Sequence, residues 1–98
     1  MGKYVFAYKG GGMAETDEER EAAMQAWGAW FGELGGAVLD AGNPFSVSTA
    51  VGGNGTSGLS GYSIVSADSL DGASQLAQGC PVLASGGSVE VYEVLEVM

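Results

Sequence analysis

The chain has 98 residues, of which 46% are hydrophobic, and its formal net charge is −9 because twelve acidic side chains outnumber three basic ones. This size fits one modest core, so we expect a single domain over residues 1–98, and the apolar content excludes a disordered chain. The acidic balance disfavours nucleic-acid and anionic-membrane partners, and the sequence shows neither a membrane-spanning run nor a signal-peptide pattern, so we expect a soluble, cytoplasmic protein.

The first predicted element is a strand over residues 3–9. Its apolar residues fall on both parities, with Tyr4, Phe6 and Tyr8 on one and Val5 and Ala7 on the other. Because successive side chains of a strand point to opposite faces, this strand presents apolar side chains on both faces of its sheet. Three glycines at residues 10–12 then predict its end.

A helix is predicted to follow, beginning at Thr16 and ending at Gly35-Gly36. Thr16 and Glu19 have the spacing of a capping box, and glycine commonly ends a helix. The side chains that recur at helical spacing are Ala23, Trp27, Trp30 and Leu34. Five of the twelve acids lie in residues 15–21, where they favour the positive end of the helix dipole. A metal site there is the disfavoured alternative, because consecutive acids on a helix point in different directions.

Two strands and a glycine-rich turn are predicted in the middle of the chain. Residues 37–41 form a short strand, and residues 45–51 alternate again after a bend at Asn43-Pro44. Asn54-Gly55 is a strong signal for a tight turn. We therefore expect residues 61–67 to form a strand that pairs antiparallel with residues 45–51.

The last third predicts a short helix and a long strand. The helix runs from about Ser69 to Gln78 and breaks at Gly79-Cys80-Pro81, and the strand runs from Ser88 to Met98. Glu93 interrupts the apolar alternation of that strand, which indicates either a bulge or a charge that points into a wet cleft.

The predicted order is strand, helix, strand, strand, helix, strand. This is the α+β, ferredoxin-like βαββαβ arrangement, a four-stranded antiparallel sheet with two helices on one face. Apolar side chains on both parities of the first and last strands leave the other face in need of cover, and an exposed apolar face of several hundred Å² usually marks an interface. We expect a face-to-face homodimer, a dimeric α+β barrel.

The residue types limit the chemistry. The chain has no histidine, which removes the commonest general base and metal ligand, and with one cysteine a zinc site is improbable. We therefore expect no metal and no cofactor. Cys80 is interpreted as a buried apolar filler. Residues 53–58 match the glycine pattern of a dinucleotide-binding loop. That loop needs a helix after it, whereas a strand is predicted here, so a hairpin turn is the better interpretation.

Six residues are the candidates for a site. Asp40 closes an apolar strand, where desolvation could raise its pKa, and is the best acid/base candidate; strand-end solvation is the alternative. Trp27 and Trp30 are either core packing or the aromatic wall of a small-ligand pocket. Tyr8 or Tyr62 would supply a hydroxyl there. Glu93 is either a solvated charge or part of this pocket.

The sequence resembles the YCII-related proteins, and within them the branch named after a DGPF motif. The matching pieces are Gly61-Tyr62, Ala67-Asp68, Cys80-Pro81 and residues 86–91, in that order, and the opening strand and the helix that ends at Gly35-Gly36 fit as well. The resemblance implies a ferredoxin-like fold in a dimeric barrel and an uncharacterised function.

The chain departs from that family's pattern in two places. The DGPF loop is replaced by the shortened, glycine-rich residues 51–59, and the histidine of the YciI-like group is missing. By the resemblance, Trp27 falls near the position of that histidine and Asp40 near the group's acidic position. The loss of both motifs favours a binding module over an enzyme.

Three functions stay open. The first is a non-enzymatic dimer that binds a small organic molecule or a protein partner. The second is a cleft enzyme, isomerase- or monooxygenase-like by fold analogy, that acts on a small organic substrate through Asp40 and the hydroxyl of Tyr8 or Tyr62. The third is a structural dimer without a ligand.

Overall fold

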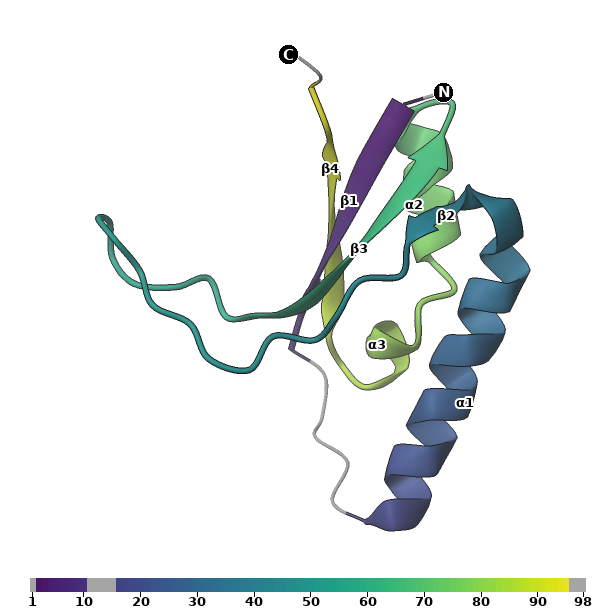
Figure 1. Cartoon of the computed structure of the whole chain (residues 1–98), viewed down its shortest axis with the longest axis horizontal. Coiled ribbons are helices and arrows are strands. Elements are labelled where there is room, and N and C mark those ends of the chain that lie inside the picture. Colours follow the sequence, from purple (N-terminus) through teal and green to yellow (C-terminus); the bar gives the residue numbers. More distant parts are fainter. Residues whose placement is uncertain (1, 11–15, 96–98) are drawn as a thin grey trace.

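The computed structural model describes residues 2–10 and 16–95, which form an α+β fold (Figure 1). Its elements in chain order are β1 (Gly2–Lys9), α1 (Asp17–Leu34), a one-turn 3-10 helix (Gly35–Ala37), β2 (Val38–Asp40), β3 (Leu59–Ala67), α2 (Leu70–Ala77), α3 (Pro81–Ala84) and β4 (Ser88–Glu93). The strands form an antiparallel sheet in the order β2-β3-β1-β4. This order confirms the predicted ferredoxin-like arrangement of the chain.

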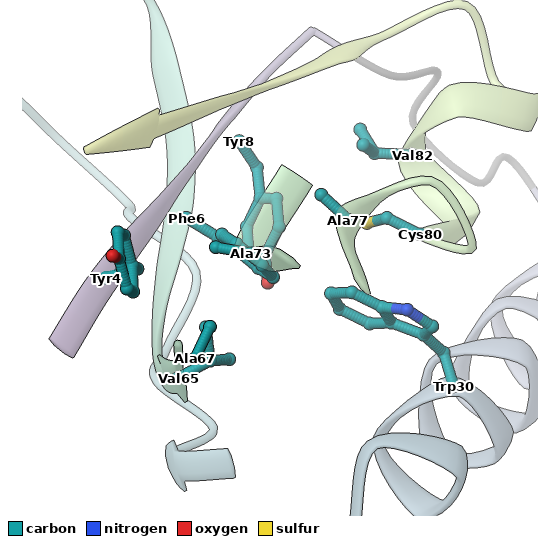
Figure 2. Close-up of a cluster of buried hydrophobic side chains, with 10 residues drawn as sticks. All are labelled: Tyr4, Phe6, Tyr8, Trp30, Val65, Ala67, Ala73, Ala77, Cys80 and Val82. Atoms are coloured by element: carbon teal, nitrogen blue, oxygen red, sulfur yellow. The ribbon is translucent and has the colours of Figure 1, made fainter. Parts of the chain in front are cut away.

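The core lies between one face of the sheet and the helices. Tyr4, Phe6 and Tyr8 of β1 are buried there, as their shared parity predicts. Residues of all three helices complete this cluster, among them Trp30 of α1, Ala73 of α2 and Val82 of α3, so the helices cover the same face (Figure 2). The strand register places Val5, Ala7, Tyr62, Ile64 and Tyr92 on the opposite face, which we call the open face.

The bounds of α1 follow from its caps, as predicted. The Thr16 hydroxyl accepts a hydrogen bond from the Glu19 N–H at 3.1 Å. At the other end Gly35 has φ +54°, and its N–H donates to the Phe31 carbonyl. Within α1 only Trp30 is buried, so the helix packs against the core through its C-terminal half. The acids that the structure describes in its first turn, Asp17 to Glu19, lie on an exposed surface, and residue 15 is outside the described residues.

The prediction of a strand over residues 45–51 is wrong. Residues 41–58, which we call the arm, form an extended irregular excursion (Figure 1). The partner of β3 is β2, with Val38 opposite Val65, and only a single bridge between Pro44 and Gly61 continues that pairing. The physical reason lies in the returning leg, where glycines with positive φ interrupt the extended conformation that a strand requires: Gly52, Gly53, Gly55 and Gly58.

The C-terminal third follows the prediction with two differences. Helix α2 and its Ser69 cap are confirmed, since the Ser69 hydroxyl accepts a hydrogen bond from the Gly72 N–H at 3.0 Å. The Cys80-Pro81 break was expected to open a loop, but Pro81 instead begins the short helix α3, because proline fits the first turn of a helix. Strand β4 ends at Glu93, earlier than predicted, and residues 96–98 of the expected strand lie outside the described residues.

Candidate functional site

Three of the candidate residues meet on the helix side of the sheet. The Tyr8 and Trp27 rings pack edge to face with centroids 4.9 Å apart, and Trp27 contacts Trp30 in the same way at 5.7 Å. Trp30 is 3% exposed and its indole N–H donates to the Leu76 carbonyl at 3.1 Å, so it serves the core. Trp27 is half-buried and is the member of this group with solvent access. Packing of its neighbours fixes this ring as an aromatic surface.

The Tyr8 hydroxyl belongs to a buried hydrogen-bond chain. It donates to the Ser63 Oγ at 2.7 Å, and that hydroxyl donates to the Ala41 carbonyl at 2.6 Å. Burial raises the pKa of Tyr8 to about 12, and the hydrogen bond with Ser63 opposes this shift without cancelling it. The phenol therefore stays neutral near pH 7. Because its proton is already donated to the Ser63 hydroxyl, Tyr8 is a poor proton-transfer group.

Asp40 and Tyr62 lie on the other side of the sheet. Asp40 stands opposite Ile64 in the register, so both carry their side chains on the open face, and Tyr62 lies two residues before Ile64 on the same face. Asp40 is exposed, and its carboxylate accepts a hydrogen bond from the Gly42 N–H at 2.9 Å. The Tyr62 ring stacks on Phe45 at the root of the arm, with centroids 5.8 Å apart and planes 18° apart.

Glu93 lies apart from both groups. It stands opposite Tyr4 in the register and accepts a hydrogen bond from the Tyr4 hydroxyl at 3.1 Å, four residues along β1 from Tyr8. Burial, and next this hydrogen bond, raise the pKa of Tyr4. The six candidates thus divide into an aromatic group on the helix side, a carboxylate and phenol pair on the open face, and an isolated Glu93.

Two hollows on the described part of the chain are lined by residues other than the candidates. A depression on the exposed side of α1 is lined by Asp17, Arg20, Glu21, Met24 and Gln25. A second hollow, of about 170 Å³, lies between α2 and β4 and is lined by Ser74, Ala77, Gln78, Leu83, Val89 and Val91.

Two residues of this region were missed at the sequence level. Ser63 links Tyr8 to the end of β2, and a polar residue at the core-facing parity of β3 was the signal that could have revealed it. Gly42, with φ +77°, turns the chain out of β2 against the backbone of Tyr62, and a Cβ there would lie 1.7 Å from the Tyr62 carbonyl oxygen. This close approach depends on strand register, which the sequence does not display.

Three further observations concern metal binding, membrane crossing and the single cysteine. Within residues 2–10 and 16–95, no cluster of three or more acidic or cysteine side chains has the geometry to hold a metal ion, and no helix is long and apolar enough to cross a membrane. Cys80 is buried as expected, and burial raises its pKa to about 11, which keeps the thiol protonated and unreactive near pH 7.

The comparisons with known proteins give one match. The family model described as YCII-related domain matches residues 3–98, nearly the whole chain, which agrees with the resemblance carried by the motifs of the last third and with the observed fold. No curated protein and no solved structure matches the chain. The chain therefore belongs to the YCII-related domain family.

Proposed function

We propose that this YCII-related chain is a non-enzymatic module that works as a homodimer and binds a small organic molecule or a protein partner. The observation that carries the proposal is the division of the candidate groups. The Tyr8 hydroxyl donates a buried hydrogen bond to Ser63 on the helix side of the sheet, whereas Asp40 lies on the open face. The sheet lies between these two groups, so Tyr8 and Asp40 do not converge in a catalytic cleft.

The open face supports the homodimer. Its centre, on β1 and β3, carries apolar side chains, and Tyr92 at its edge is 54% exposed. The charged side chains of this face lie at its margins, with Asp40 and Glu90 on the two outer strands and Lys3 and Lys9 at the two ends of β1. An apolar centre with a polar rim is the composition of a protein–protein interface. A second copy meets this requirement without any further partner.

Trp27 supports a binding role. Its ring is held from one side by Tyr8 at 4.9 Å and from another by Phe31 at 6.0 Å, and it keeps part of its surface accessible. A rigid, partly exposed indole binds flat apolar molecules at low entropic cost. In this proposal Trp27 is the wall that a ligand contacts, and Trp30 holds it in place.

The test combines light scattering with a thermal-shift screen of small organic molecules. Wild type is expected to be a dimer, and Tyr92→Asp is expected to weaken it by placing a charge on the open face. A ligand that raises the melting temperature of wild type should lose its effect in Trp27→Leu and keep it in Asp71→Asn, a control on the exposed side of α2. A wild type that stays monomeric at all concentrations contradicts the dimer, and ligands unaffected by Trp27→Leu contradict the site.

The cleft enzyme is kept as a second candidate because Asp40 and Tyr62 share the open face on adjacent strands. A second copy over that face would enclose a carboxylate and a phenol together, the pair that a proton-transfer reaction on a small organic substrate needs. Turnover of a compound found in the screen, abolished in both Asp40→Asn and Tyr62→Phe, would replace the binding module by this enzyme.

A further inference from the structure

The arm, residues 41–58, is held to its own protomer only at its root. The Phe45 N–H donates to the Ser60 carbonyl at 2.9 Å, and the Tyr62 N–H donates to the Asn43 carbonyl at 3.3 Å. Beyond this pair, no backbone hydrogen bond joins the two legs within these described residues. Figure 1 shows the arm running out from the sheet on the side away from α1. Its outer part therefore lacks the support that its own fold gives to the rest of the chain.

Apolar side chains project from this unsupported part. Val51 is 98% exposed and Val47 is 90% exposed, against 47% for Phe45 at the root. Single exposed apolar residues are common, but here they lie on one extended segment that continues from an aromatic stack. Because Phe45 stacks on Tyr62, the root of the arm is continuous with the open face. The aromatic stack therefore joins the apolar residues of the arm to those of the open face.

The distribution of charge identifies which partner this surface fits. The chain carries a net charge of −9, so two copies repel each other unless their contact surfaces are neutral. Residues 41–67, which comprise the arm and β3, contain no charged residue. The whole projecting arm thus lies within the longest neutral stretch of the chain. A basic partner would instead call for acidic side chains on the arm, and the arm has none.

The length of the arm suits the width of the sheet. Extended chain rises about 3.3 Å per residue, so residues 45–51 span about 20 Å. The four strands lie about 4.8 Å apart, so the sheet is about 15 Å wide between its outer strands. One leg of the arm is therefore long enough to cross the sheet of a neighbouring protomer.

We propose that the arm of each protomer packs across a second copy of this chain and buries Val47 and Val51 against it. The inference rests on the proposed homodimer and deepens it, because it makes the arm part of the interface rather than a free loop. In this arrangement each protomer both receives an arm on its open face and contributes one.

Thiol protection tests the proposal, because the native Cys80 is buried and its protonated thiol gives a low background. Cysteine is introduced at the arm in Val51→Cys and Val47→Cys, and at an exposed position on the helix side in the matched control Ser85→Cys. Rates of reaction with a maleimide are measured on the dimer and on a monomer, obtained by dilution or by adding Tyr92→Asp. In the dimer the arm cysteines are expected to react at least about tenfold more slowly than the control, and in the monomer at a similar rate.

Each outcome has a defined meaning. A wild type that is dimeric by light scattering while both arm cysteines react as fast as the control overturns the arm inference and leaves the homodimer standing. A wild type that is monomeric at every concentration overturns both. Protection that persists in the monomer overturns the inference in another way, because the arm would then cover its own sheet.

Discussion

The turn at Gly42 gives a prediction whose magnitude follows directly from the structure. Gly42 and Gly52 both have φ +77°, a conformation that costs a side-chain-bearing residue about 1–2 kcal/mol. They differ in their surroundings. A Cβ at Gly42 would lie 1.7 Å from the carbonyl oxygen of Tyr62 and 2.6 Å from its carbon, whereas a Cβ at Gly52 would meet nothing within 4 Å.

Gly52→Ala should therefore cost only its backbone strain, about 1 kcal/mol of unfolding free energy once the stiffer unfolded chain is counted. Gly42→Ala adds a clash with the backbone of β3, a strand paired on both sides, so the contact is not relieved by a side-chain rotation. We expect a loss of more than about 4 kcal/mol, in the range reserved for severe core defects.

Urea denaturation followed by tryptophan fluorescence measures the difference, since Trp27 and Trp30 both lie in or against the core. The two variants and wild type are compared at one protein concentration, because dimerisation would make apparent stability depend on it. Failure of Gly42→Ala to fold while Gly52→Ala folds agrees with the reasoning. Equal costs for the two variants would refute it, because the close approach of the arm root to Tyr62 would then not exist.

Three further predictions follow from contacts in the core and at α1. Ser63→Ala should cost about 2–3 kcal/mol, because it leaves the buried Tyr8 hydroxyl without a partner, whereas Tyr8→Phe should cost about 1 kcal/mol; the double variant should be no less stable than Ser63→Ala, and a simple sum of the two costs would contradict the hydrogen-bond chain. Stability should also fall at alkaline pH. The pKa values of Tyr8 and Cys80 rise on folding from 10.0 to about 12 and from 9.0 to about 11, so the unfolded chain ionises first and the stability that is full below pH 9 is lost between pH 9 and 12. Denaturation midpoints against pH should show that Tyr8→Phe reduces the loss between pH 10 and 12 and retains the part between pH 9 and 11 that Cys80 causes. Finally, Thr16→Ala should cost about 1 kcal/mol and speed amide hydrogen exchange in the first turn of α1, and unchanged exchange there would contradict the cap.

The parts of the fold that could be predicted depend on local chemistry. Thr16 begins α1, Gly35 ends it and Ser69 begins α2, because each supplies or permits a hydrogen bond to the neighbouring turn. The buried parity of β1 follows from alternation alone. Given these elements and their order, the ferredoxin-like sheet needs few further assumptions.

The prediction of a strand over residues 45–51 was wrong because an alternating sequence is not sufficient for a strand. Residues 45–51 alternate in sequence, yet a strand also needs a paired neighbour, and the leg that returns from residue 52 to residue 58 carries four glycines with positive φ. The edge of β3 is occupied instead by β2, three residues long. Which short segment takes an open sheet edge is decided by long-range register, and periodicity does not contain that information.

The candidate site shows the same limit at the level of single side chains. Trp27 and Trp30 are three residues apart on a helix, so their contact could be predicted, and the structure has it. Whether Tyr8 and Tyr62 share a face depends on how β1 and β3 are aligned. Tyr8 stands opposite Gly61, so Tyr62 stands opposite Ala7 and points to the other side.

A shift of one residue in that pairing would have placed both phenols on the same face. The two hydroxyls were equal alternatives in the sequence, but in the fold they belong to different environments. Tyr8 is sealed in the core with a pKa of about 12 and its proton donated to Ser63, whereas Tyr62 stands on the open face with Asp40. Of these two phenols, only Tyr62 lies on the same side of the sheet as Asp40. Chemistry that uses this pair also needs a cover over the open face, so a test of catalysis by Asp40 and Tyr62 is also a test of the proposed homodimer.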